Sequence, residues 1–213
     1  VYGSGTLADT LASSATYRNT ATTNVIANVV QGPVKSTTTY VGNEGEEKAK
    51  LTLNYNYLGV YVKTSTVFTY VADILTQSTT YRNTVTMGQV NDSEKATGAT
   101  PVSNLKKSIT TYFGGEGEEK ALRTYNFSGD NTSIKTVTAF GYGAGILDET
   151  LAQSTTTRNT ATTNMNVIAS VVTGPTRSIT LYSGYEGEEK AQTTYNFNYD
   201  GNQIKTFTVF VYG

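Results

Sequence analysis

Hydrophobic and polar residues alternate along much of the chain with a period of two, the period of a β-strand whose two faces have different surroundings. The pattern is clearest over residues 62–70, 134–142 and 204–212, where an aliphatic residue, two threonines, a phenylalanine and a tyrosine share one face. Lysine and small or apolar residues occupy the other face. β-Branched and aromatic residues dominate these stretches, so we predict strands there.

A second alternating segment precedes each of these strands, as in residues 191–199. Asp200-Gly201 then predicts a hairpin turn. Earlier strands end near Gly42, Gly114 and Gly184, and a Glu-Gly-Glu-Glu-Lys loop follows each of them. Further upstream, segments such as residues 11–23 and 25–30 are interpreted as additional strands. We therefore expect four or five antiparallel strands per unit in meander order, with little helix.

The same segments recur three times. The string Glu-Gly-Glu-Glu-Lys-Ala occurs at residues 44–49, 116–121 and 186–191. Arg-Asn-Thr occurs at residues 18–20, 82–84 and 158–160. We predict an all-β protein of three tandem repeats of about 71 residues, namely repeat 1 (1–68), repeat 2 (69–140) and repeat 3 (141–213). One such repeat cannot bury its apolar face alone, so the repeats should stack into a continuous β-shell, tube or solenoid-like array.

The phase of the repeat at the two ends suggests continuation. The chain opens with Val1-Tyr2-Gly3 and closes with Val211-Tyr212-Gly213, which is one point of the repeat. The repeats therefore either close into a ring or belong to a longer array. A head-to-tail contact that does not close generates a filament.

Composition narrows the function. The 213 residues include neither His nor Cys, which excludes Ser-His-Asp and Cys-His catalysis, disulfide scaffolds and nearly every zinc site. The net charge of −1 does not indicate the basic surface that a nucleic-acid-binding protein needs. No apolar run is long enough for a membrane-spanning helix. With 40 Thr, 17 Asn and only 15% charged residues, the chain resembles an extracellular or cell-surface protein of a bacterium. We expect no enzyme activity, no cofactor and no metal.

Residues 195–205 (Tyr-Asn-Phe-Asn-Tyr-Asp-Gly-Asn-Gln-Ile-Lys) resemble the YD, or Rhs-type, repeat, in which alternating tyrosines precede Asp, a Gly turn and an aliphatic residue. The resemblance implies antiparallel β-shells in large secreted or surface proteins. Repeats 1 and 2 depart from it, with Tyr57-Leu58-Gly59 and Ser128-Gly129-Asp130 at this point. The whole chain is also similar to giant repetitive Thr/Tyr-rich bacterial surface proteins.

Several recurring side chains are candidates for contacts between repeats or subunits. They are Arg18, Arg82, Arg158, Glu44, Glu116, Glu186, Lys48, Lys120, Lys190, Tyr2, Tyr70, Tyr142 and Tyr212. For the arginines we favour ties to Asp9, Asp73, Asp148 or the Glu loops, with binding of an anionic sugar or phosphate as the alternative. For the Glu loops we favour a solvated hairpin, with cation binding or catalysis as alternatives. The lysines also permit isopeptide crosslinks to Asn.

The repeats are equivalent, so a collective role is expected. We predict a structural protein that self-associates head to tail into an extracellular filament, sheath or surface layer. The alternative is a repeat adhesin or carbohydrate-binding module that presents tyrosine faces to surface glycans. An enzyme with two carboxylates would need one repeat to differ at a cleft; repeat 2 differs at residues 89–99, where only Asp92 and Glu94 are acidic.

Overall fold

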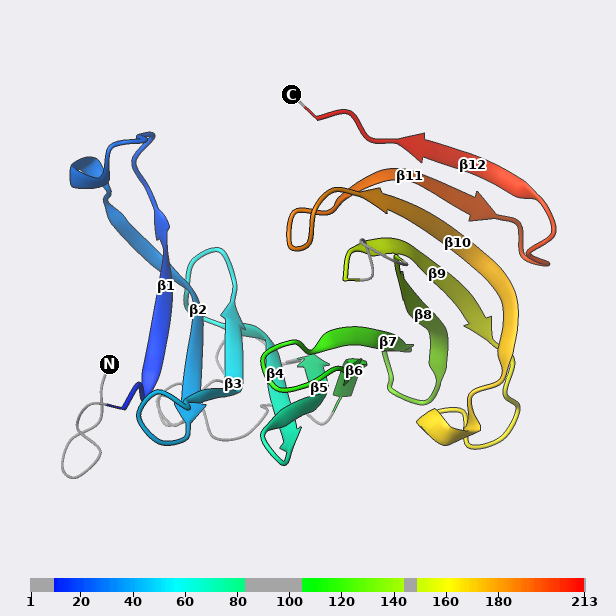
Figure 1. The fold of residues 1–213 in the computed structure, drawn as a ribbon, viewed down its shortest axis with the longest axis horizontal. Coiled ribbons are helices and arrows are strands. Elements are labelled where there is room, and N and C mark those ends of the chain that lie inside the picture. The colour runs from blue at the N-terminus through cyan, green and yellow to red at the C-terminus, as the bar shows by residue number, and fades with distance from the viewer. Residues whose placement is uncertain (1–9, 83–104, 144–148, 213) are drawn as a thin grey trace. The chain divides into compact units, whose positions relative to one another are not determined.

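The computed structural model describes residues 10–82, 105–143 and 149–212. These residues form twelve antiparallel strands in one open sheet, and the order of the strands in the sheet is their order in the chain (Figure 1). The strands are β1 (Ser13–Asn19), β2 (Gln31–Val41), β3 (Lys48–Tyr55), β4 (Val62–Val71), β5 (Ile74–Arg82), β6 (Leu105–Phe113), β7 (Lys120–Phe127), β8 (Ile134–Tyr142), β9 (Leu151–Asn159), β10 (Thr173–Ser183), β11 (Lys190–Phe197) and β12 (Ile204–Val209). The all-β prediction is confirmed.

Four strands correspond to each stretch of the sequence repeat: β1–β4, β5–β8 and β9–β12. The strand predicted over residues 25–30 is wrong, because the short 3₁₀ helix η1 (Ile26–Asn28) lies there, and η3 (Ile168–Ser170) is its counterpart. The Asn19 side-chain Oδ1 accepts bonds from the backbone amides of Ala21 and Val30, which closes the segment into a loop. No helix in the described ranges is long and apolar enough to cross a lipid bilayer.

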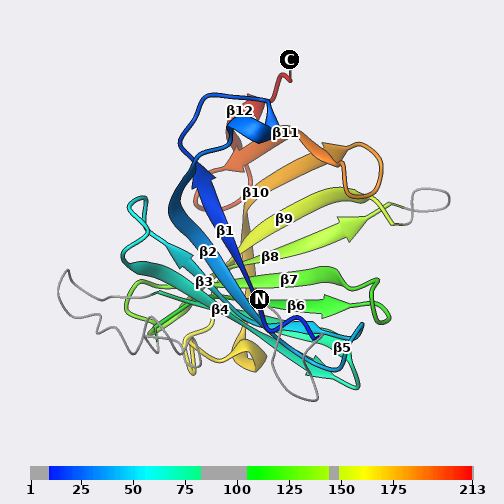
Figure 2. The same cartoon turned by 90° about the vertical axis from the view of Figure 1, so that its left-hand side faces the viewer.

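The chain divides into two compact units, one comprising residues 1–70 and 78–106 and the other residues 71–77 and 107–213. In the first unit, the buried core consists of Leu51, Leu53 and Val62, with Tyr55 and Val67 packed against it. In the second unit, β7–β12 follow one another side by side (Figure 2). Its buried core consists of Ile109, Tyr125, Phe127, Ile134 and Val137.

The strict period-two pattern of β4, β8 and β12 is interrupted by a β-bulge. Phe127 pairs with Ile134 although Asn126 pairs with Thr136, so β8 has one extra residue at this point. The bulge turns Ile134 to the face that carries Val137, away from the threonines. The prediction that the aliphatic residue shares a face with the threonines is therefore wrong, because one inserted residue reverses the alternation.

Threonines form hydrogen-bonded pairs on the opposite face of the sheet. Within repeats, the hydroxyl oxygens of Thr38 and Thr52, of Thr110 and Thr124, and of Thr180 and Thr194 lie 2.8–2.9 Å apart. Between repeats, Thr66 bonds to Thr80 (3.0 Å) and Thr138 to Thr156 (2.8 Å). Such cross-strand pairs contribute roughly 0.2–1 kcal/mol each and fix the register of the strands.

Candidate functional site: the junction between repeats

The best-described junction joins repeat 2 to repeat 3 through the antiparallel strands β8 and β9. Val137 pairs with Thr157, and Thr138 pairs with Thr156. The Asn159 side-chain amide donates to the Ile134 carbonyl (2.9 Å). The Ile134 backbone amide donates to the Met165 carbonyl (2.7 Å). Backbone and side-chain hydrogen bonds therefore both connect the two repeats.

Apolar contacts at the same junction come from the loop that carries η3. Ile168 and Val171 of repeat 3 pack against the core cluster of repeat 2. Under this cover, Ile134 is only 2% exposed and Val137 only 8%. Repeat 2 thus completes its hydrophobic core with side chains of the next repeat, as repeat proteins generally do.

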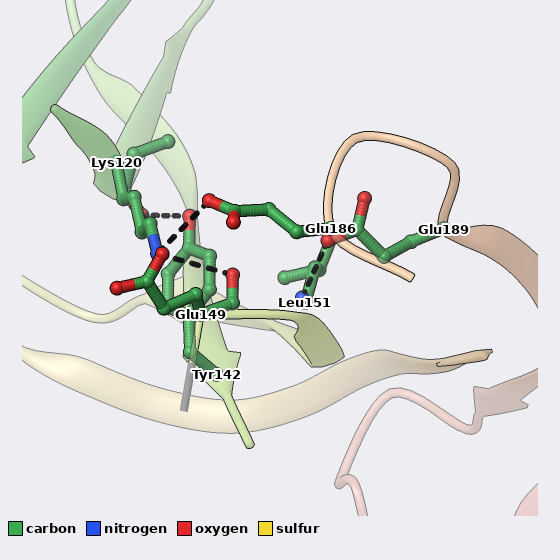
Figure 3. Close-up of polar contacts among 7 residues, drawn as sticks. Lys120, Tyr142, Glu149, Leu151, Glu186 and Glu189 are labelled. Atoms are coloured by element: carbon green, nitrogen blue, oxygen red, sulfur yellow. Dashed lines mark hydrogen bonds and ion pairs between the residues drawn. The ribbon is translucent and has the colours of Figure 1, made fainter. Parts of the chain in front are cut away.

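A charged cluster completes the junction (Figure 3). The Lys120 ammonium lies 3.3 Å from a carboxylate oxygen of Glu186 and 3.4 Å from one of Glu149, and it also donates to the Glu149 carbonyl (3.2 Å). Lys120 belongs to repeat 2, and both glutamates belong to repeat 3. Two predicted contact residues, Lys120 and Glu186, therefore meet across repeats.

Electrostatics at this cluster favour the charged lysine. Desolvation acts to lower the pKa of Lys120, but the bonds to Glu186 and Glu149 outweigh it, so the pKa is raised above the ordinary value. Burial raises the pKa of the neighbouring Tyr142 hydroxyl, although the Lys120 charge opposes this shift. Lys120 therefore stays protonated and Tyr142 neutral at physiological pH.

The last glutamate of each Glu-Gly-Glu-Glu-Lys loop has a structural role. Glu189 accepts a bond from the backbone amide of Leu151, at the start of β9 (3.0 Å; Figure 3). Glu47 accepts one from Leu11 (2.8 Å), and Glu119 accepts one from Leu75 (2.9 Å). We call this contact the glutamate latch; in each repeat it ties the loop to the beginning of the first strand.

The latch hydrogen bonds stabilise the ionised carboxylates. The bond from Leu11 lowers the pKa of Glu47, and the bond from Leu151 lowers that of Glu189. Glycine amides of the loops reinforce the latch, because Gly45 donates to Glu47 and Gly117 to Glu119. The three equivalent carboxylates are thus engaged with backbone donors.

The predicted lysines and tyrosines lie together in pairs. The ammonium groups of Lys48, Lys120 and Lys190 lie 5.9, 5.8 and 5.2 Å from the ring centroids of Tyr70, Tyr142 and Tyr212, respectively. The hydroxyls of Tyr142 and Tyr212 donate to the carbonyls of Ala121 and Ala191. These cation–π pairs connect the first residue of β3, β7 and β11 to the end of the hairpin that each of these strands begins. Tyr2 lies outside the described residues.

The predicted arginines donate to backbone carbonyls of the next strand. Arg18 donates to Val34 (2.7 Å), Arg82 to Lys106 (2.8 Å) and Arg158 to Thr176 (3.1 Å). Two of the expected acidic partners, Asp9 and Asp148, lie outside the described residues. Arg18 also lies 5.5 Å from the Tyr57 ring centroid, and Arg158 lies 5.1 Å from that of Tyr199.

The first glutamates of the loops, Glu44, Glu116 and Glu186, are all exposed. Within the described ranges, no group of three acidic side chains converges as metal ligands would. Within each loop, the last glutamate thus forms the glutamate latch, whereas the first glutamate is exposed. At the exposed position, Glu186 contacts Lys120 of the neighbouring repeat.

Sequence reasoning missed two features, one within each repeat and one at the junction. It did not separate the latch glutamates from the first glutamates of the loops, although both recur with the repeat. It interpreted residues 25–30, which contain η1, as a strand, although their apolar residues follow no alternation. A recurring apolar run between two loop segments was the available signal for a packing role.

No protein-family model, no curated protein and no solved structure matches this chain.

Proposed function

We propose that this chain is a structural protein that self-associates head to tail into an extracellular filament, sheath or surface layer. In this assembly, repeat 3 of one copy contacts repeat 1 of the next copy as repeat 2 contacts repeat 3 within the chain. The contact is heterologous, so it propagates when it does not close into a ring. The repeats would then form a continuous β-shell, tube or solenoid-like array.

One observation carries the proposal: the two end repeats expose complementary halves of the internal junction. Ile204 and Phe207 occupy the positions of Ile134 and Val137, yet they are 54% and 66% exposed. At the other end, Ile26 occupies the position of Ile168 and is 91% exposed. Repeat 3 lacks the cover that repeat 1 carries on η1, and an exposed apolar surface of this kind marks an interaction site.

The sheet edges offer matching hydrogen-bond partners. β1 and β12 are the two edge strands in the described sheet, and edge strands present backbone groups that pair with another chain. In the register of β8 and β9, Thr208 would face Thr16 of the next copy, as Thr138 faces Thr156. Asn19 would donate to the Ile204 carbonyl, as Asn159 donates to that of Ile134.

The charges agree with this arrangement. Lys190 is the counterpart of Lys120 and is exposed on repeat 3, whereas Glu44 is the counterpart of Glu186 and is exposed on repeat 1. Head-to-tail contact would bring the two together as Lys120 and Glu186 meet now. The glutamate latches also favour a structural role over catalysis, because their carboxylates serve the fold in every repeat.

Sedimentation and electron microscopy of the purified chain test the proposal. We expect filaments or sheets that pellet, and we expect Phe207→Lys and Ile26→Lys each to abolish them, because each places a charge in the apolar contact. Leu122→Lys is the matched control, since Leu122 is also exposed (42%) but lies on the central strand β7. Particles of 22.9 kDa at every concentration, or filaments that survive both interface variants, would contradict the proposal.

A further inference from the structure

The second compact unit contains a cavity of about 640 Å³ at the junction between repeats 2 and 3. The cavity is lined by Lys135 and Thr136 of β8, by Arg158 of β9 and Arg177 of β10, and by Tyr199 of the β11–β12 turn. Three of these side chains are cationic, and none of the described residues that line the cavity is acidic. The cavity is therefore an electropositive site built from two repeats.

Two contacts hold the Arg158 guanidinium group in place. Arg158 donates through Nη1 to the Thr176 carbonyl (3.1 Å), and its guanidinium group lies 5.1 Å from the centroid of the Tyr199 ring. These contacts orient the guanidinium and leave its other N–H groups available to a ligand. A guanidinium held in this way is suited to bidentate recognition of an oxyanion.

The turn that carries Tyr199 is fixed against β10. Gly201 adopts φ +71°, and a Cβ atom there would lie 2.7 Å from the Thr176 amide nitrogen. Only glycine allows this approach at low cost. The Tyr199 ring is nevertheless 78% exposed, so it presents an aromatic surface beside the cations.

We propose that this cavity binds an acidic carbohydrate, with the sugar oxyanion held by Arg158, Arg177 and Lys135 and the sugar ring placed against Tyr199. Thr136, Asn159 and Thr160 also line the cavity. Carboxylate and sulfate groups on a sugar share this chemistry. The combination of a cationic centre and an exposed aromatic ring favours a charged sugar over a free inorganic ion.

Repeat 1 carries one half of the same site. A cavity of about 530 Å³ is lined by Arg18, Lys35 and Tyr57, the counterparts of Arg158, Arg177 and Tyr199. Among the described residues, no strand beside β1 supplies the wall that β8 supplies to the complete site, because β1 is an edge strand. In the proposed assembly, Lys205 and Thr206 on β12 of the preceding copy would supply that wall, so each contact between copies completes a second site.

Repeat 2 provides the internal contrast. Gly129 stands where repeats 1 and 3 have tyrosine. Without the ring, the repeat 2 turn offers no aromatic surface to a sugar. We therefore assign the site to the junctions that repeats 1 and 3 form with a preceding repeat.

Calorimetric titration of the monomeric chain with tetragalacturonate tests the site apart from assembly, because the complete cavity lies within one chain. We expect one site per chain, and we expect Arg177→Gln and Lys135→Gln each to weaken binding about tenfold. The matched controls are Lys35→Gln and Lys205→Gln, the counterparts in repeat 1 and on β12, which should leave binding to the monomer unchanged. In the assembled form, the stoichiometry should rise to two per chain, and Lys205→Gln should then weaken one of the two sites.

Titrations with other ligands identify the chemical group that the cavity recognises. Tighter binding of a sulfated tetrasaccharide would support the site and identify sulfate as its oxyanion. Equal binding of neutral maltotetraose, or binding of inorganic phosphate as tight as that of the sugar, would overturn the proposal. So would loss of binding in the two control variants of the monomer equal to that in Arg177→Gln. A chain that binds the sugar at one site and never assembles would refute the proposed function and leave this inference standing.

Discussion

The β7–β8 and β11–β12 hairpins are one structural element in successive repeats, yet their apolar residues have opposite surroundings. Ile134 is 2% exposed in β8, whereas Ile204 is 54% exposed at the same position of β12. Both hairpins have the same pairing register and the same bulge. The difference comes from Ile168 and Val171, which cover the first hairpin. Burial in this protein is thus decided by the next repeat rather than by the strand itself.

The largest expected effect separates these two isoleucines. Ile134→Ala should lower the free energy of unfolding by about 2–5 kcal/mol, because it leaves a cavity in a packed core. Ile204→Ala in the monomer should cost less than about 1 kcal/mol, because the side chain is already half in water. Urea denaturation of both variants, at concentrations where the chain is monomeric, measures the difference.

The same two variants, Ile134→Ala and Ile204→Ala, can also be compared in the assembled state. There the cost of Ile204→Ala should approach that of Ile134→Ala, since the next copy would cover the residue. Equal costs in the monomer would show that β12 is already buried in solution and that the comparison is mistaken.

A second, smaller contrast concerns the turns that join the same hairpins. Gly201→Ala should destabilise the monomer by about 1–3 kcal/mol, because φ is +71° and the new Cβ would meet the backbone of Thr176. A Cβ atom added to Gly129, two residues before the repeat 2 counterpart of Gly201, would meet no atom within 4 Å. Gly129→Ala should therefore be neutral or stabilising by up to about 1 kcal/mol.

Thermal denaturation followed by circular dichroism compares the two variants directly. Gly201→Ala should also weaken sugar binding, because the turn positions Tyr199, whereas Gly129→Ala should not. Similar melting temperatures for the two variants would mean that the repeat 3 turn is not held against β10.

The strands and their order could be predicted from the sequence, whereas the contacts between repeats 2 and 3 could not. Alternation, hairpin turns and repetition predicted an all-β meander, because these signals are local. The bulge at Ile134 was missed because its one-residue shift depends on pairing with Phe127. The role of Ile168 was missed because it contacts another repeat, and no local pattern reports such a contact. Lys120 and Glu186 were identified as candidates because they recur, but the sequence did not say that they face each other.

The smallest expected effect is a pH dependence of stability that comes from Asp130 in the repeat 2 turn. The Ser128 hydroxyl, the Thr132 amide and the Thr132 hydroxyl all donate to the Asp130 carboxylate and lower its pKa from 3.8 to about 2. The folded state therefore holds the ionised form more tightly than the unfolded state does. The resulting stabilisation is complete above pH 3.8, declines as the pH falls towards 2 and is absent below it.

The stability difference between the wild type and Asp130→Asn, measured by urea denaturation from pH 2 to 6, should follow this curve. Subtracting the variant removes the contributions of Glu47 and Glu189, whose pKa values are also lowered. NMR titration of the Asp130 carboxyl group should give a midpoint near 2. Thr132→Val should raise it, because the substitution removes the hydroxyl donor and leaves two of the three donors. A wild-type midpoint near 3.8 would show that the carboxylate is not held by the turn.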